Sequence, residues 1–186
     1  MTAQGTALAA LRADLRDGFL TPGDQVVQET LAERYGVSRV PLREALKTLE
    51  AEGQVVYHPN RGYFVTELRV ADLLEVYRLR ELLEAEAISV AVPALSDEDV
   101  DAFAELLHDV DVASAAGDVE TLTAANRRFH FAIFDAAGLP RLSRLLRQLW
   151  DATDAYRSLY FASTVNRARV DREHAAMLAA LRPPAV

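Results

Sequence analysis

The stretch that decides the fold spans residues 31 to 46: Leu31-Ala32-Glu33-Arg34-Tyr35-Gly36-Val37-Ser38-Arg39-Val40-Pro41-Leu42-Arg43-Glu44-Ala45-Leu46. Gly36 is suited to end a short helix that begins near residue 28, because glycine readily adopts the backbone conformation that follows a helix. Ser38 suits the N-cap of a second helix, which continues to about residue 52. Ala32 is small where the two helices must cross closely. The pattern predicts a helix-turn-helix.

The second helix carries an apolar stripe and a basic stripe. The apolar positions recur at i, i+3, i+4 and i+7, and they are Leu42, Ala45, Leu46 and Leu49. The basic positions lie four residues apart, within an arc of roughly 80°, and they are Arg39, Arg43 and Lys47. A helix fits the major groove of DNA, and arginine can bind O6 and N7 of guanine together. We therefore predict that the basic stripe, with Val40 beside it, contacts DNA; the alternative is an exposed face that is only solvated.

The flanking segments complete a winged helix-turn-helix. Residues 6–18 have the apolar spacing of a first helix. Residues 54–57 and 63–66 are rich in valine and tyrosine, as strands are, and residues 58–62 form a compact loop between them. We predict a DNA-binding domain of three helices and a β-hairpin wing over residues 1–68.

Two further groups are placed to meet DNA. Ser38 and the free amides at the start of its helix suit a phosphate oxygen. At the tip of the wing, Arg61 can reach an adjacent minor groove, and Gly62 lets the loop approach closely. The predicted DNA-binding set is therefore Ser38, Arg39, Val40, Arg43, Lys47, Arg61 and Gly62.

The charge balance limits how such a protein binds nucleic acid. The net charge is −8, and residues 1–68 carry seven Lys or Arg against nine Asp or Glu. Non-specific affinity for DNA rises with phosphate neutralisation, so an acidic chain should bind through a local cluster and at defined sites. The chain has no cysteine, which excludes disulfides and thiolate metal sites. It shows no signal peptide or transmembrane stretch, so we expect a cytoplasmic protein that does not bind membranes.

From residue 70 onward every segment has helical periodicity. The predicted helices span 70–91, 97–115, 119–137, 140–164 and 167–181, and Pro183-Pro184 ends the last one. The fold class is therefore mainly α, with an all-helical antiparallel bundle over residues 69–186. The join at residues 67–71 is short, so the two domains should be mechanically connected.

Several polar residues fall on the buried faces of these helices. At about 100° per residue, the inward set is Arg80, Glu84, Asn126, His130 and His174, whereas His108 and Arg78 point away. Buried polar groups need partners, so the set predicts a shared cavity in which Arg80 binds the carboxylate of a small effector. The alternative is a set of separately satisfied core residues, such as an Arg80–Glu84 pair.

The N-terminal motifs resemble those of the GntR family of bacterial regulators. The resemblance covers residues 8–66 and rests on Leu20–Asp24, on the 31–46 stretch and on Pro59–Val65. It implies a homodimer on a short palindromic operator, with Ser38, Arg39, Arg43 and Gly62 at positions that contact DNA. Glu29 departs from the pattern, because some relatives carry a DNA-contacting arginine there. That contact should be absent, and the preferred operator should differ.

Residues 70–182 are similar to the FCD ligand-binding domain of the FadR subgroup. The resemblance rests on Arg80–Ala87, Asn126–His130 and Arg172–His174. It implies a divalent metal, zinc or nickel, held by an aspartate and three histidines. Here Asn126 replaces the aspartate, His130 and His174 match, and the last histidine has no counterpart. The chain ends about where the final helix of such a domain should begin, so we expect weak or absent metal binding and a more open cavity.

Three functions follow from these features. The first is an effector-responsive transcriptional regulator, acting as a repressor, whose operator affinity depends on a small organic acid in the helical domain. The second is a DNA-binding dimer that ignores ligands and keeps a vestigial effector domain. The third is a metal-assisted hydrolase that uses His130 and His174. No general base is suitably placed beside these histidines, and no Ser-His-Asp set is present, so we do not expect an enzyme.

Overall fold

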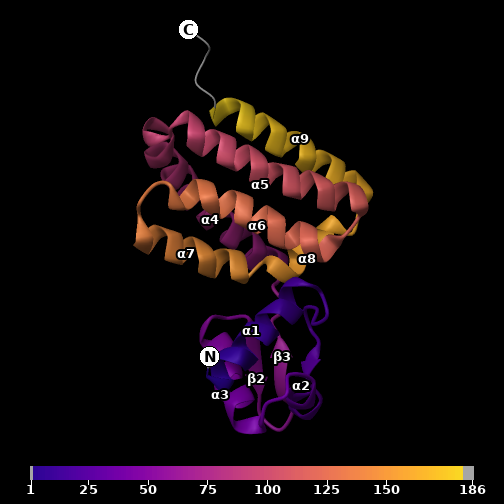
Figure 1. Cartoon of the computed structure of the whole chain (residues 1–186). Helices are drawn as coiled ribbons and strands as arrows, with labels where there is room; N and C mark the ends of the chain where they lie inside the picture. The colour runs from indigo at the N-terminus through magenta and orange to yellow at the C-terminus, as the bar shows by residue number, and fades with distance from the viewer. Residues whose placement is uncertain (1, 182–186) are drawn as a thin grey trace.

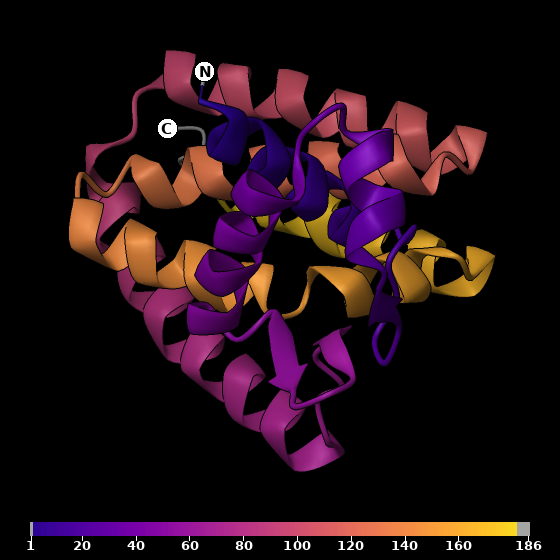
Figure 2. The same cartoon turned by 90° about the horizontal axis from the view of Figure 1, so that it is seen from below.

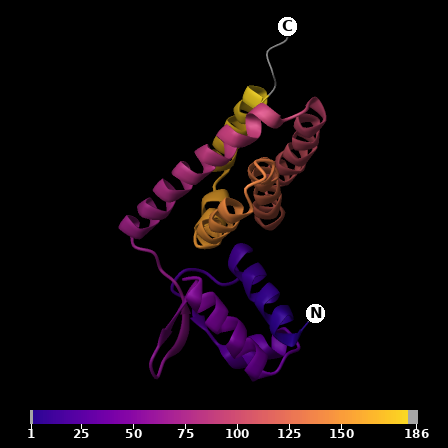
Figure 3. The same cartoon turned by 90° about the vertical axis from the view of Figure 1, so that its left-hand side faces the viewer.

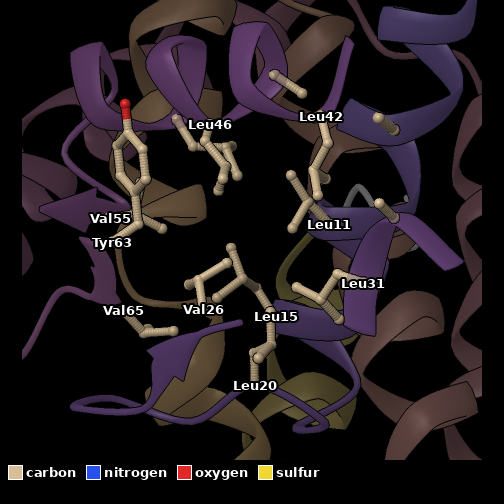
Figure 4. Close-up of a cluster of buried hydrophobic side chains, with 14 residues drawn as sticks. Leu11, Leu15, Leu20, Val26, Leu31, Leu42, Leu46, Val55, Tyr63 and Val65 are labelled. Atoms are coloured by element: carbon tan, nitrogen blue, oxygen red, sulfur yellow. The ribbon is translucent and has the colours of Figure 1, made fainter. Parts of the chain in front are cut away.

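The N-terminal unit is built around the helix-turn-helix. The computed structural model describes residues 2–181, which include α1 (Ala3–Arg16), α2 (Gln28–Arg34) and α3 (Arg39–Ala51). Gly36, at φ +64°, ends α2 and turns the chain toward α3. The apolar stripe of α3 is buried as predicted, and Figure 4 shows Leu42 and Leu46 pointing toward Leu11 and Leu15 of α1. The core of this unit is thus formed where the three helices meet the sheet.

The wing is part of a three-stranded antiparallel sheet. Strands β2 (Val55–His58) and β3 (Gly62–Val65) form the expected hairpin, in which Val55 pairs with Val65 and His58 with Gly62. A third strand, β1 (Gln25–Val26), pairs with the other edge of β3. The sequence did not indicate β1, because two residues are too few to show alternation. It forms because its backbone pairs with β3, which lies far along the chain. Just before β1, the Asp24 carbonyl accepts a hydrogen bond of 2.8 Å from the Val65 N–H of β3.

The second unit is an antiparallel bundle of helices. It contains α4 (Val70–Ala91), a 3₁₀ turn η1 (Val92–Ala94), α5 (Asp97–Ala116), α6 (Val119–Asp135), α7 (Pro140–Asp151), α8 (Asp154–Phe161) and α9 (Thr164–Leu181). Figure 1 shows these helices stacked above the N-terminal unit, with α7 and α8 nearest to it. In Figure 3, α4 runs along one side of the bundle, starting from the linker. The predicted helix stop at Pro183-Pro184 lies outside the described residues.

One predicted helix is divided in two. Residues 140–164 were expected to be continuous, but the chain breaks between α7 and α8, and α9 begins at Thr164. At the break, the buried Thr153 hydroxyl donates to the carbonyls of Leu149 and Trp150, at 3.3 and 3.2 Å. Threonine side chains that bond to nearby carbonyls compete with helix continuation. The break frees α8 to turn toward the N-terminal unit.

Contacts between the two units gather around α8. The Tyr156 hydroxyl accepts a hydrogen bond of 2.7 Å from the backbone N–H of Leu68, in the linker before α4. The Ser158 hydroxyl donates to the carbonyl of Arg16, the last residue of α1. In Figure 2, which views the molecule from below, the N-terminal unit lies in front of the helices of the second unit. None of the helices within residues 2–181 combines the length and apolar character needed to cross a membrane.

Candidate DNA-binding surface and helical-domain cavity

The exposed side of α3 carries the residues expected to meet DNA. Arg39, Arg43 and Lys47 are all exposed, opposite the buried leucines. Val40 beside them is 72% exposed, so its methyl groups are free to contact a thymine methyl group. Ser38 occupies the N-cap position, but its side chain makes no capping hydrogen bond. Its hydroxyl and the first amides of α3 therefore remain available to an acceptor.

Two of the three basic residues on α3 already have acidic partners. Arg39 donates from Nη2 to Oε1 of Glu29, which lies in the first turn of α2. Lys47 donates to Glu44 at 2.8 Å, one turn away on the same helix. Arg43 has no ion-pair partner within the described part of the chain. The basic stripe is thus largely neutralised in the protein alone.

The tip of the wing is held in one conformation. Gly62 has φ +87°, a backbone conformation that side-chain-bearing residues rarely adopt, and Asn60 next to the tip has φ 62°. The Gln25 side-chain amide donates to the Arg61 carbonyl at 2.8 Å. The Arg61 guanidinium lies over the Phe64 ring, 5.0 Å from its centroid. The tip therefore presents Arg61 at its exposed end on a supported loop.

The helical unit contains a cavity of about 400 Å³ between α4, α6, α8 and α9. Four of the residues predicted to face inward line it, namely Arg80, Asn126, His130 and His174. Glu84 is not among the lining residues, because its carboxylate accepts from Arg80 Nε at 2.9 Å and from Trp150 Nε1 at 2.8 Å. The Arg80–Glu84 pair considered from the sequence therefore exists, and it supports a cavity wall.

Arg157 of α8 lines the same cavity and was missed from the sequence. Its guanidinium stacks on Trp150 at 4.0 Å, and Arg80 lies 4.1 Å from the same ring. Burial lowers the pKa of Arg157 to about 10, and the charge of Arg80 adds to the effect. The Thr153-Asp154 sequence, typical of a helix start, was the signal that could have revealed a separate α8 and thus this residue.

The polar atoms of Arg157 are poorly satisfied. Its side chain is 11% exposed, and its Nε lies 3.7 Å from Asp154 Oδ1, beyond hydrogen-bond distance. That aspartate is engaged by Arg127 at 2.8 Å. Among the described residues, Nε and Nη2 of Arg157 have no hydrogen-bond partner. A buried guanidinium in this state is a strong site for an anion.

The two histidines line the cavity side by side and contact each other directly. Their Nε2 atoms are 3.0 Å apart. Burial lowers the pKa of His174 to about 4, and burial followed by the neighbouring His174 lowers the pKa of His130 well below its ordinary value. Both imidazoles are therefore neutral near pH 7. Within the described residues, neither Nδ1 atom has a hydrogen-bond partner, and Asn126 Nδ2 has none either.

These donors do not fit a tightly held zinc or nickel ion. Within residues 2–181, no three His, Cys, Asp or Glu side chains come together in a group that could hold a metal. Asn126 adds only a neutral amide, and the charges of Arg157 and Arg80 act on His130. Arg80 is already paired with Glu84, but among the described residues two nitrogens of the Arg157 guanidinium have no hydrogen-bond partner and can bind an anion. The cavity chemistry therefore favours an anionic ligand.

Each of the two units matches a known protein family. Residues 3–65 match the model of the bacterial regulatory proteins of the gntR family, and residues 75–183 match the FCD domain. The chain belongs to the GntR family. Within it, the chain is 34% identical over 140 residues to the HTH-type transcriptional regulator McbR of Escherichia coli (strain K12), a match that covers 75% of this chain and 63% of McbR. The match thus spans less than two thirds of the length of that relative.

Other relatives agree with this assignment. The chain is 30% identical to the HTH-type transcriptional repressor GlaR of the same organism, over 83% of this chain and 72% of GlaR. Its fold matches the solved structure of E. coli McbR/YncC with a TM-score of 0.85 at 29% identity, covering 97% of this chain and 86% of that one. These relatives are named as transcriptional regulators, so the hydrolase considered from His130 and His174 finds no support among them.

Proposed function

We propose that this GntR-family chain is a DNA-binding transcriptional repressor whose operator affinity is changed by a small carboxylate in the cavity of the helical unit. The exposed face of α3, the wing tip and the family assignment support DNA binding through Ser38, Arg39, Val40, Arg43, Lys47, Arg61 and Gly62. The name of GlaR as a repressor supports the direction of regulation.

The observation that carries the effector proposal is the Arg157 guanidinium. It is buried, it lines the cavity, and two of its nitrogens have no hydrogen-bond partner among the described residues. A carboxylate placed there can bind Arg157 through two parallel hydrogen bonds. Arg80 lines the same cavity and lies over the same Trp150 ring, and Asn126 can donate its free amide. The neutral histidines add donors without adding negative charge.

Helix α8 supplies the route from the cavity to the DNA-binding unit. Three consecutive residues reach three different places: Tyr156 holds the linker at Leu68, Arg157 lines the cavity, and Ser158 holds the end of α1. Successive helical residues are about 100° apart, which explains the three directions. Because all three residues belong to the same short helix, a ligand that moves Arg157 together with α8 also moves the two contacts. A ligand shifts the regulator only if it binds one arrangement more tightly than the other.

We further propose a homodimer that binds a palindromic operator. A two-fold dimer presents two copies of α3 to two related half-sites, which is the usual arrangement for helix-turn-helix proteins. The exposed apolar side chains of α4 support an interface between copies, because Val70, Leu74 and Leu82 are 75%, 65% and 63% exposed. Exposed apolar faces of this kind commonly mark protein contacts.

The test uses the single tryptophan as an internal reporter. Trp150 lies against both Arg80 and Arg157, so a bound carboxylate should change its fluorescence. Monocarboxylates and dicarboxylates are titrated into the protein, and the same compounds are added to its complex with a duplex selected from a random pool. The proposal expects a compound that changes Trp150 fluorescence and releases the duplex over the same concentration range.

A matched pair of variants locates the site. Arg157→Gln should abolish the carboxylate response while duplex binding persists, whereas Arg172→Gln, an exposed change on α9, should leave both intact. Circular dichroism and duplex binding show that each variant is folded. If no carboxylate affects either Trp150 or the duplex, the ligand-insensitive DNA-binding dimer is the better description.

A further inference from the structure

A carboxylate of α2 holds the first arginine of α3. Glu29 and Arg39 form an ion pair, with Nη2 of the arginine donating to Oε1 of the glutamate. Their side chains are 68% and 67% exposed. A pair this exposed adds little to stability, typically about 0–1 kcal/mol. Its consequence lies instead in what the Arg39 guanidinium is able to bind.

The hydrophobic core fixes the place of this pair. Helices α2 and α3 pack through Leu31, Ala32 and Leu42, all of them buried. Glu29 therefore stays beside the start of α3 whatever rotamers the two side chains adopt. The first turn of α3 contains no acidic residue, although the start of a helix carries positive partial charge. Glu29 supplies from α2 the negative charge that this helix end lacks.

We propose that Glu29 determines the specificity of the DNA interface by orienting Arg39 toward one guanine and keeping it away from phosphate. The guanidinium has five N–H donors in a planar fork. When one donor of Nη2 is held by Glu29, orientations in which the remaining donors of the fork face outward are favoured. That geometry suits O6 and N7 of a single guanine. An arginine without this partner rotates freely and can bind any phosphate oxygen.

The Glu29 carboxylate also lowers the affinity of the protein for the phosphates of the DNA backbone. Glu29 and Arg39 together carry no net charge, so this corner of the interface gains nothing from the phosphates. Replacing Glu29 with glutamine restores one net positive charge. Each added phosphate contact steepens the fall of log K with log salt by about 0.9. For Glu29→Gln, the two effects together predict weaker discrimination between bases and higher non-specific affinity for DNA.

The inference rests on DNA binding through α3, and the experiment tests that step first. The wild-type protein and Arg39→Gln each select duplexes from a random pool, and the guanine whose preference is lost in Arg39→Gln marks the Arg39 position. Failure of the wild-type protein to select any sequence would overturn the proposed interface and, with it, the role of Glu29. If Arg39→Gln loses the preference for a single guanine, DNA binding through α3 is supported, and the role of Glu29 can then be tested at that guanine.

Fluorescence anisotropy then compares the selected duplex, the same duplex with that guanine replaced, and an unrelated duplex over a series of salt concentrations. Glu29→Gln should reduce discrimination at that guanine by about fivefold or more. It should also steepen the salt dependence on the unrelated duplex by about 0.9 per bound protomer. Glu33→Gln is the matched control, since Glu33 is exposed on the same helix, and it should leave discrimination unchanged.

A double variant distinguishes orientation of Arg39 from simple charge repulsion. In the Arg39→Gln protein, the further change Glu29→Gln should have no effect on discrimination at the marked position. The proposal is overturned if Glu29→Gln alters all three duplexes in parallel. It is also overturned if Glu29→Gln and Glu33→Gln behave alike, or if discrimination is unchanged.

Discussion

Replacing Tyr156 with phenylalanine removes one oxygen atom at the junction between the two units. The lost hydroxyl accepts the Leu68 N–H at 2.7 Å in a partly buried position. A neutral hydrogen bond of this kind contributes about 0.5–1.5 kcal/mol, and an orphaned amide adds to the cost where water cannot replace the partner. Because the junction is only partly buried, we expect Tyr156→Phe to lower the free energy of unfolding by about 1 kcal/mol.

Urea unfolding followed by Trp150 fluorescence measures this loss. With an m-value of about 2–3 kcal/mol/M, the midpoint should fall by roughly 0.3–0.5 M. A second measurement addresses the bond directly, since hydrogen exchange at the Leu68 amide should become about fivefold faster. That factor corresponds to about 1 kcal/mol.

Tyr160→Phe is the matched control, because Tyr160 lies on the same helix and is partly exposed. It should change the free energy of unfolding by less than about 0.5 kcal/mol. Equal effects of the two variants, or unchanged exchange at Leu68, would show that the Tyr156 hydroxyl does not hold the linker. The proposed route through α8 would then lose one of its two contacts.

Three further outcomes are expected. Leu46→Ala, at a fully buried position, should lower the free energy of unfolding by about 2–5 kcal/mol in urea titrations; a loss below 1 kcal/mol would mean that α3 repacks. Arg43→Ala should weaken the selected duplex by about 1–3 kcal/mol and an unrelated duplex by less, and equal losses in anisotropy would limit Arg43 to phosphate contacts. The pKa of His174 is depressed to about 4 in the folded protein, so between that value and about 6.5 the unfolded chain binds more protons than the folded one. The contribution of neutral His174 to the free energy of unfolding should therefore be fully present above pH 6.5 and decline as the pH falls toward 4. His174→Gln should reduce this slope, which is at most about 1.4 kcal/mol per pH unit for one group, and an unchanged slope would contradict the assignment.

The elements of the DNA-binding unit could be predicted because their signals are local. The end of α2 follows from Gly36 alone, and the buried face of α3 follows from the spacing of apolar residues within one helix. Strand β1 could not be predicted, because its two residues become a strand only by pairing with β3, almost forty residues away. The break before α8 was missed for a related reason. Helix α7 ends at Asp151, and Thr153 is the N-cap of α8, so the break falls within three residues and carries no glycine or proline to mark it.

The sequence by itself determined that four polar side chains of the helical unit face inward. Helical periodicity assigns Arg80, Asn126, His130 and His174 to buried faces, and these four line one cavity. Only the tertiary structure decided what each inward group meets. Glu84 accepts hydrogen bonds from Arg80 and Trp150. Arg157 lines the cavity because the chain breaks at Thr153 and begins a new helix. Glu29 of α2 pairs with Arg39 of α3 across the turn. Periodicity fixes direction around one helix axis, whereas contacts between helices depend on their crossing and spacing, which the whole core sets.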